Sequence, residues 1–215
     1  MAKPIYLLGA GGHASVLTDM LQENGLMVSF LCSPEVDSSR KVLADIPIIK
    51  DENVLFHENA ADLVLVNGIG SLPNDTLRNK IFNKFSEHGF LFQQVISKDA
   101  IVSSFATLGH GVQVMPGAIV QAGATIGDNT IINTGAIIEH DCILGKHNHI
   151  APGVTLSGQV FTGDNVHIGS GATVIQNISI GTGTVIAAGA IVTKHIESEK
   201  IVFGARANIQ DKKVK

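Results

Sequence analysis

The apolar residues in the second half of the chain recur every six positions. When residues 101–196 are written in consecutive rows of six, the second position is Val, Leu or Ile in fifteen of sixteen rows, and Thr162 is the exception. The third position is Gly in six rows, and the sixth is mostly Ala, Val, Thr or Cys. An α-helix repeats about every 3.6 residues and an isolated strand about every two. A period of six instead predicts a solenoid of short strands and turns.

Three rows make one triangular coil of eighteen residues, and the rows give a little over five coils. The aliphatic second position is expected to point into the prism, and the small sixth position to let the chain turn in a narrow interior. Such a core has little room for large rings, in agreement with nine Phe, one Tyr and no Trp. At about 4.8 Å per coil, the prism is roughly 25 Å tall. A β-sandwich with an accidental period is disfavoured, because the register runs unbroken over ninety-six residues.

The first hundred residues show a different pattern. Residues 4–12 predict a buried strand that enters a glycine turn, and residues 13–24 predict a helix. Further strands are expected at 26–31 and 62–67, and a helix at 74–88. This order predicts a small parallel sheet with helices on its faces, as in Rossmann-like α/β domains.

The chain of 215 residues therefore divides into a Rossmann-like domain over 1–97 and a β-helix with a C-terminal tail over 98–215. Its 45% hydrophobic and 16% charged residues exclude a disordered chain. A net charge of -4 without a long basic cluster makes nucleic acid an unexpected partner. Residues 100–127 carry no charge, but glycines and polar residues interrupt them, so no membrane insertion is expected. Two cysteines and the absence of a signal-peptide pattern predict a cytoplasmic protein.

The glycine turn at 9–12 lets the backbone approach a phosphate at the start of a helix, where free N–H groups favour an anion. A dinucleotide motif would place a third glycine at Ala14 and an acidic residue after the second strand, where Cys32 and Ser33 stand. NAD is therefore disfavoured, and the pyrophosphate of a nucleotide-sugar is predicted.

Three segments together resemble a known family: GAGGHA before the first helix, NGIGS after the third strand, and a hexapeptide helix that begins near residue 100. They resemble bacterial sugar acetyltransferases of the sialic-acid O-acetyltransferase group. The nearest likeness is to enzymes that acetylate the 4-amino group of a UDP-linked 4-amino-4,6-dideoxy-N-acetylglucosamine, which yields UDP-N,N'-diacetylbacillosamine. The resemblance covers nearly the whole chain. It implies a left-handed β-helix, a homotrimer, acetyl-CoA as co-substrate, a UDP-sugar as substrate and no metal.

The resemblance also implies site residues. The predicted substrate-binding residues are Gly11, Gly12, His13, Cys32, Ser33 and Gly68. The predicted acetyl-CoA-binding residues are His149, Ser170 and Ala188. The predicted catalytic residues are His140 as general base, Asp141 as the group that raises its basicity, and Gly158 as oxyanion donor.

The repeat itself supports part of this assignment. His140 stands fourth in the row IIEHDC, on a turn rather than in the core, with Asp141 after it and Glu139 as the competing carboxylate. Imidazole suits the removal of a proton from an attacking amine near neutral pH, and a nearby carboxylate favours its protonated form. Gly158 lies one coil later at the same corner, where its backbone N–H could hold an oxyanion.

Two other columns follow from the eighteen-residue coil. His149 and His167 open equivalent rows and should stack on one face. Ser170 and Ala188 share another corner with Pro152, along which an extended pantetheine could lie. The closing segment GARANI at 204–209 resembles the end of the family, with Arg206 in the place of its usual proline.

Several other functions stay open. The chain could be a sugar O-acetyltransferase, or an N-acetyltransferase for GDP- or TDP-amino-sugars. A β-helical zinc hydratase could use His140, His147 and His149, although it would have no use for a nucleotide-binding domain. A non-catalytic sensor of nucleotide-sugars is supported only by the two-domain layout.

Overall fold

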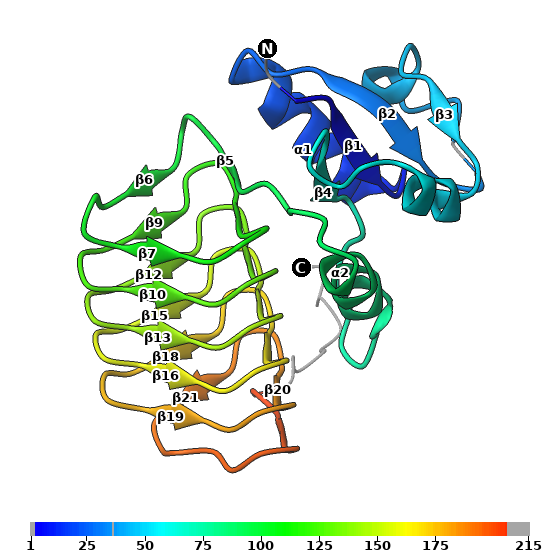
Figure 1. Cartoon of the computed structure of the whole chain (residues 1–215). Helices are drawn as coiled ribbons and strands as arrows, with labels where there is room; N and C mark the ends of the chain where they lie inside the picture. Colours follow the sequence, from blue (N-terminus) through cyan, green and yellow to red (C-terminus); the bar gives the residue numbers. More distant parts are fainter. Residues whose placement is uncertain (1–2, 36, 206–215) are drawn as a thin grey trace, which may run out of the picture.

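A computed structural model describes residues 3–35 and 37–205, and it consists of a small α/β part and a tall prism (Figure 1). The α/β part contains a four-stranded parallel sheet in the order β3-β2-β1-β4. Its elements are β1 (Ile5–Leu8), α1 (Gly12–Glu23), β2 (Val28–Cys32), η1 (Lys41–Leu43), β3 (Ile48–Ile49), η2 (Glu52–His57), β4 (Val64–Asn67) and α2 (Leu77–Glu87). The predicted parallel sheet is confirmed, while β3 and the two short 3₁₀-helices carry no periodic signal in the sequence.

The sheet buries an apolar cluster on each of its two faces. Leu7 of the central strand β1 is completely buried, and so are Leu17 and Leu21 on the inner face of α1. These two leucines are four residues apart, so they lie one above the other on one side of the helix. A second cluster of buried rings, among them Phe85 of α2, covers the other side of the sheet.

The prism is a parallel β-helix. Its strands of two residues each form three sheets of seven, six and five strands, which we call the β14, β12 and β13 sheets after one member of each. The strands are β5 (Val95–Ile96), β6 (Ile101–Val102), β7 (Thr107–Leu108), β8 (Gln113–Val114), β9 (Ile119–Val120), β10 (Thr125–Ile126), β11 (Ile131–Ile132), β12 (Ile137–Ile138), β13 (Ile143–Leu144), β14 (His149–Ile150), β15 (Thr155–Leu156), β16 (Phe161–Thr162), β17 (His167–Ile168), β18 (Thr173–Val174), β19 (Ser179–Ile180), β20 (Val185–Ile186), β21 (Ile191–Val192) and β22 (Ile201–Val202).

The pairing of these strands confirms the eighteen-residue coil. Ile131 pairs with His149, and His149 pairs with His167. The first strand is β5, so the coils begin at Val95, slightly before the boundary at residue 98 expected from the sequence. Within the described residues the coils end at β22, and the rest of the GARANI segment lies outside them.

The second position of each row fills the interior, as predicted. Val120, Ile138 and Leu156 are all buried in this core. Thr162, the exception to the pattern, is equally buried, and its hydroxyl accepts a hydrogen bond of 2.7 Å from the amide of Asn148. A buried polar side chain is costly unless it is paired, and this pairing explains how the coil accommodates Thr162.

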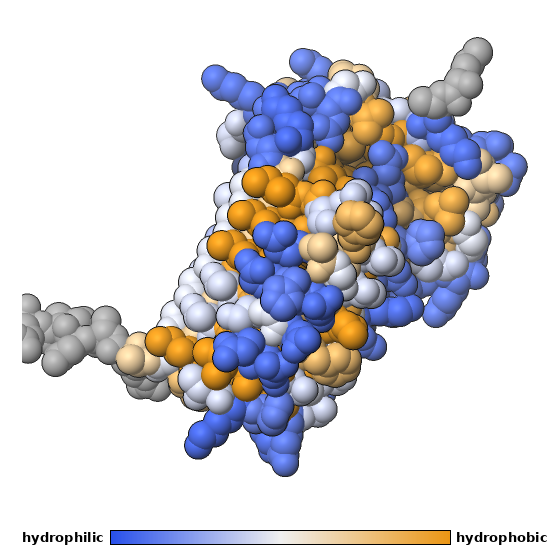
Figure 2. Space-filling view, turned by 90° about the vertical axis from the view of Figure 1, so that its left-hand side faces the viewer, coloured by the Kyte–Doolittle hydropathy of each residue, from blue (hydrophilic) through white to orange (hydrophobic). Residues whose placement is uncertain are grey.

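The outward side chains of the β12 sheet form a row of isoleucines along the prism, which Thr155 and Thr173 interrupt. Ile101 and Ile191, at its two ends, are 64% and 72% exposed. Figure 2, which views the prism from the side of β6 and β9, shows hydrophobic side chains gathered on this face. None of the described helices is long and apolar enough to span a bilayer.

The two parts of the chain are joined by hydrogen bonds as well as by the connecting segment. Asn24, at the end of α1, donates from its amide to the carbonyl of Ile96 over 2.7 Å. α2 runs beside the prism (Figure 1), where Asn79 donates to Asn165 over 2.6 Å. The α/β domain is therefore held against one side of the β-helix.

Candidate active site

His140 and Asp141 form a pair on the turn between β12 and β13. Their side chains are both more than half exposed, and His140 Nδ1 lies 2.9 Å from Asp141 Oδ2. Since a carboxylate can only accept, Nδ1 carries a proton, and in the neutral ring Nε2 presents a lone pair. Asp141 has a φ of 59°, a conformation that Asp and Asn tolerate better than most residues. The turn thus prepares one imidazole nitrogen to take a proton.

Gly158 lies against the free side of this imidazole. A Cβ added at Gly158 would lie 2.5 Å from His140 Nε2, so any side chain here would displace the ring. Among the backbone hydrogen bonds of the described turns, the Gly158 carbonyl accepts from Asn177, and no bond from the Gly158 N–H is found. The predicted base and the predicted oxyanion donor are therefore neighbours.

His149 is positioned differently, on the outer face of the β14 sheet. Its Nδ1 lies 3.0 Å from the carbonyl of Ser71, and its Nε2 lies 3.1 Å from the amide nitrogen of Asn133. The carbonyl can only accept, so Nδ1–H donates and Nε2 accepts from the amide. Burial, aided by the neighbouring His167, lowers the pKa of His149 to about 3. His149 is therefore neutral, with both nitrogens engaged, which suits hydrogen bonding rather than proton transfer.

His149 and His167 meet edge to face, with ring centroids 4.8 Å apart. This confirms the stacking predicted from the repeat. Burial also lowers the pKa of His167, and its buried Nδ1 has no hydrogen-bond partner among the described residues.

His13, at the start of α1, reaches across to the β-helix. Its Nε2 donates to Gln113 of β8 over 2.7 Å, and the amide of Gln113 donates to the carbonyl of Asn67 over 2.8 Å. Burial, with a contribution from the positive charge of Arg78, lowers the pKa of His13 to about 4. Through Gln113, His13 thus connects α1 with the β-helix and with the end of β4.

Arg78 is a buried cation with no carboxylate in contact among the described residues. Its guanidinium donates to the carbonyls of Asn67 (3.0 Å), Ile69 (2.7 Å) and Asn129. Burial lowers its pKa to about 9. Arg78 was not predicted from the sequence, because nothing in the pattern of α2 separates it from an exposed helical arginine.

Three cavities follow one another along the junction of the two parts. The sheet-edge cavity, of about 310 Å³, is lined by Leu8, Gly9, Cys32, Ser33, Pro34, Glu52, Ile69, Leu77 and Ile81. The histidine cavity, of about 330 Å³, is lined by His13, Ile69, Gly70, Ser71, Leu72, Asp75, Ile131 and His149. The coil cavity, of about 450 Å³, is lined by residues that include His149, His167, Ser170, Ala188 and Phe203.

The three cavities share walls. Ile69 borders both the sheet-edge and the histidine cavity. Ser71, Leu72 and His149 border both the histidine and the coil cavity. The three connected cavities can therefore hold two elongated ligands whose ends meet inside them.

The glycine turn lies between residues of the first two cavities: Gly9 lines the sheet-edge cavity and His13 lines the histidine cavity, whereas Gly11 and Gly12 line neither. Gly11 caps α1 without a side chain, and Gly12 is the first residue of the helix. A Cβ added at Gly12 would meet only the guanidinium of Arg40, at 3.7 Å. Arg40 Nε lies 3.7 Å from Asp37 Oδ2, too far for a hydrogen bond, and it has no hydrogen-bond partner among the described residues. Arg40 was not predicted from the sequence, because its place over the turn depends on how the loop after β2 folds back.

The remaining predicted substrate residues divide into two groups. Cys32 and Ser33 are buried at the end of β2 and line the sheet-edge cavity. Gly68 lines none of the three cavities, and a Cβ there would lie 2.8 Å from the carbonyl of Leu8 and 3.0 Å from Ala14. In the structure, Gly68 therefore permits close packing of β1, β4 and α1.

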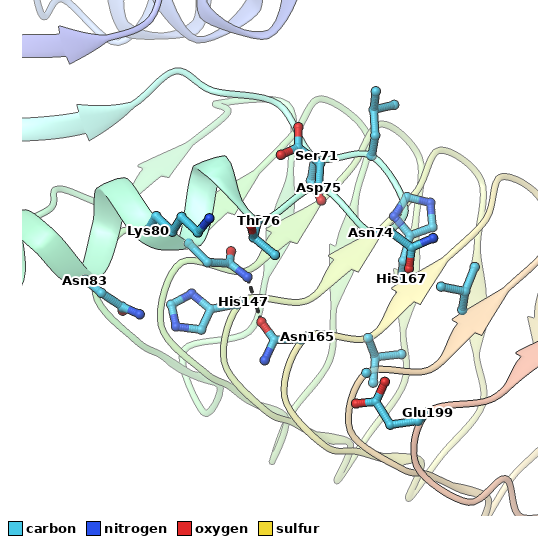
Figure 3. A pocket seen from close by; sticks show the side chains of 15 residues that line it. Ser71, Asn74, Asp75, Thr76, Lys80, Asn83, His147, Asn165, His167 and Glu199 are labelled. Carbon is cyan, nitrogen blue, oxygen red and sulfur yellow. Dashed lines mark hydrogen bonds between the residues drawn. The ribbon is translucent and has the colours of Figure 1, made fainter.

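A fourth cavity, of about 390 Å³, lies between α2 and the corner joining the β13 and β14 sheets. In Figure 3, Thr76 and Lys80 face it from the helix, and His147 and Asn165 face it from the corner. Polar side chains surround it, and none of the predicted site residues lines it.

One chain brings half of the predicted site residues together along the connected cavities. His13, His149, Ser170 and Ala188 lie along the connected cavities. His140 stands at the corner between the β12 and β13 sheets, and the β12 face separates it from the corner of Ser170 and Ala188. Within the described parts of the chain, no three His, Cys, Asp or Glu side chains are grouped as a metal site would need.

Two family models match the chain. Residues 4–85 match the PglD N-terminal domain, and residues 123–158 and 160–194 match the bacterial transferase hexapeptide repeats. A comparison with curated proteins finds no significant relative.

Solved structures match over nearly the full length. A histidine-to-asparagine variant of perosamine N-acetyltransferase from Caulobacter crescentus, in complex with CoA and GDP-perosamine, is 33% identical, with 99% of each chain covered and a TM-score of 0.84. The acetyltransferase domain of PglB from Neisseria gonorrhoeae, in complex with acetyl coenzyme A, is 29% identical, with 94% of this chain and 96% of that chain covered and a TM-score of 0.84. WeeI from Acinetobacter baumannii shares the fold at 20% identity, with 94% and 97% covered and a TM-score of 0.79.

The predicted fold is thereby confirmed: an α/β domain followed by a left-handed β-helix. The predicted activity class, acetyl transfer from acetyl-CoA, is confirmed as well. The chain belongs to the hexapeptide-repeat sugar acetyltransferases that carry a PglD-type N-terminal domain.

Proposed function

We propose that this enzyme transfers the acetyl group of acetyl-CoA to the 4-amino group of a nucleotide-linked 4-amino-4,6-dideoxyhexose. The observation that carries the proposal is the row of three connected cavities between the nucleotide-binding domain and the β-helix. The base is uracil in the prediction from the sequence, and guanine in the substrate bound to the Caulobacter relative.

The glycine turn supports a pyrophosphate between the sheet-edge and histidine cavities. The N–H groups at the start of α1 and the helix dipole favour an anion there. The guanidinium of Arg40 faces Gly12 with its NH1 group, 3.7 Å from the position of an added Cβ, so it can contribute a donor and a positive charge. In this arrangement the sugar enters the histidine cavity, where His13 and His149 lie.

The coil cavity supports acetyl-CoA. Ser170 and Ala188 line it one coil apart on the same corner, as expected for contacts with an extended pantetheine. His149 borders both this cavity and the sugar cavity, so it lies where the thioester and the amine would meet.

The chemistry then requires one base and one oxyanion donor. The amine nitrogen attacks the thioester carbonyl carbon, a C–N bond forms, and the carbonyl π electrons move to oxygen, which the Gly158 N–H stabilises. His140 Nε2 takes the proton released by nitrogen, while Asp141 stabilises the imidazolium. The C–S bond breaks as the carbonyl re-forms, and the CoA thiolate leaves with the bonding electrons and takes up a proton.

His140 must reach the coil cavity of another copy, because the β12 face separates the two within one chain. A homotrimer with its active sites between subunits meets this requirement. The exposed isoleucines Ile101 and Ile191 on the β12 face support such an assembly, since apolar side chains gathered on one face often mark an interface.

The proposed function is tested by release of free thiol from acetyl-CoA in the presence of 4-amino-4,6-dideoxyhexoses linked to GDP, UDP or TDP. Acetylation at nitrogen 4 of at least one of them, seen in the product by mass spectrometry and NMR, is the expected result. Acetylation only at a hydroxyl would instead identify an O-acetyltransferase.

A further inference from the structure

The sheet-edge cavity combines apolar walls with a single charge. Leu8, Ile69, Leu77 and Ile81 supply flat aliphatic surface from a strand end, a loop and α2. Glu52, in the short helix η2, is the one charged residue among those that line it. The neighbouring Cys32 is a neutral thiol, because burial, and after it the charge of Glu52, raises its pKa to about 12.

The carboxylate of Glu52 is held at the edge of this cavity. Its Oε1 lies 3.5 Å from Lys84 Nζ, and Lys84 in turn donates to the Asn53 side chain over 2.7 Å. Lys84 follows Ile81 by three residues on α2, so it lies on the same side of the helix as the apolar wall. An ammonium therefore lies beside the carboxylate.

The location of the cavity assigns it to the nucleoside end of the substrate. It lies at the carboxyl ends of β1 and β2, where open parallel sheets bind their ligands. Ile69 separates it from the histidine cavity, which the proposed function assigns to the sugar. If the pyrophosphate binds at Gly12 and the sugar binds in the histidine cavity, the base lies in the sheet-edge cavity.

We propose that Glu52 selects guanine, so that the substrate is a GDP-linked amino-sugar rather than the UDP-sugar predicted from the sequence. This inference rests on the proposed function. Guanine presents two adjacent donors, N1–H and the N2 amino group, to which one carboxylate can bind with two parallel hydrogen bonds. Lys84 does not line the cavity itself, and its ammonium lies behind the carboxylate, beside Glu52 and Asn53, where it favours the charged form that accepts both hydrogen bonds.

The other bases do not match this pair. Uracil and thymine offer one N–H between two carbonyl oxygens, and these oxygens would be repelled by the carboxylate. Adenine and cytosine offer one amino group beside an unprotonated ring nitrogen. The apolar walls strengthen this discrimination, because hydrogen bonds to a charge weigh more where water is excluded.

The test is calorimetric binding of GDP, UDP, dTDP and ADP to the full chain without acetyl-CoA. We expect GDP to bind at least about tenfold more tightly than the others, the value of a charged hydrogen bond. Glu52→Gln should weaken the binding of GDP about tenfold or more, and the binding of UDP should stay unchanged or become tighter. Glu87→Gln, which removes an exposed carboxylate at the end of α2, is the matched control and should change neither.

Three outcomes would overturn the inference. UDP or dTDP binding as tightly as GDP would show that the base is not selected in this way. Equal weakening of GDP and UDP by Glu52→Gln would show that the carboxylate supports the fold rather than the base. If no nucleotide binds while acetyl-CoA still does, the proposed nucleotide-sugar function fails, and the inference fails with it.

Discussion

His140 donates its Nδ1–H to Asp141 over 2.9 Å, while its Nε2 is directed at Gly158 from the next coil. The two nitrogens of the His140 ring thus have different roles. One is fixed by a carboxylate, and the other is left beside a backbone N–H that can hold an oxyanion. This pair and the cavities at the junction of the two domains lead to five testable expectations.

His140→Ala should lower kcat by roughly 10²–10⁴-fold and hardly change either KM, because general acid–base catalysis contributes about that much and no binding contact is removed. Steady-state kinetics with both substrates measures this. His110→Ala is the matched control, since His110 occupies the same fourth position in another row and is also exposed. Near-normal turnover in His140→Ala would show that another group acts as the base.

Asp141→Asn should lower kcat by roughly tenfold, less than the loss of the imidazole, because a charged hydrogen bond is replaced by a neutral one. Asn tolerates the positive φ of this position, so the fold should be retained. The acid limb of the pH–rate profile should move to lower pH, since the imidazolium loses its neighbouring anion. An acid limb that does not move would contradict the pairing.

Mixed oligomers test whether the active site lies between subunits. A His140→Ala chain and an Ala188→Phe chain, which blocks the coil cavity, should each be nearly inactive alone. After co-refolding in equal amounts, about one quarter of the sites should combine two intact halves in a cyclic assembly. Activity near that level is expected. A complete lack of recovery, or a stable monomer in light scattering, would place the whole site in one chain.

Gly12→Val should raise the KM for the nucleotide-sugar about tenfold or more, because its side chain would stand between the helix N-terminus and the pyrophosphate. The fold itself should accept it, since a Cβ there meets only Arg40 at 3.7 Å. The KM for acetyl-CoA should stay unchanged. Asp19→Val, which places the same residue further along α1 on its exposed side, controls for helix propensity. An unchanged KM for the nucleotide-sugar would show that the pyrophosphate does not bind at this turn.

Stability should fall as the pH drops from about 6.5 toward 4. His13 and His149 have pKa values of about 4 and about 3 in the fold, against 6.5 as the ordinary value. In this window the unfolded chain binds more protons, so each residue can remove up to about 1.4 kcal/mol per pH unit. Thermal unfolding at pH 7 and pH 5 should show a smaller drop for His149→Gln than for the wild type. The thermal stability of His57→Gln, a variant at an exposed site, should fall between pH 7 and pH 5 as much as that of the wild type.

The β-helix could be read almost entirely from the sequence. Each coil repeats the same short-range requirement, an inward aliphatic residue and a small residue at the turn, so the six-residue pattern determines both the strands and the interior. The pairing of His149 with His167 and the place of Gly158 beside His140 followed from the eighteen-residue spacing alone. Even Thr162 is consistent with this pattern, since Asn148 from the preceding coil satisfies it.

The cavities and their charges were decided by the tertiary structure. Arg78 and Arg40 resemble ordinary surface arginines in the sequence, and only the docking of α2 and the return of the loop after β2 place them at the site. Glu52 lies in a segment without periodicity, far in sequence from the strand end that it faces. A repeat specifies contacts between neighbouring coils, whereas a site between two domains depends on contacts between distant segments, for which the pattern carries no signal.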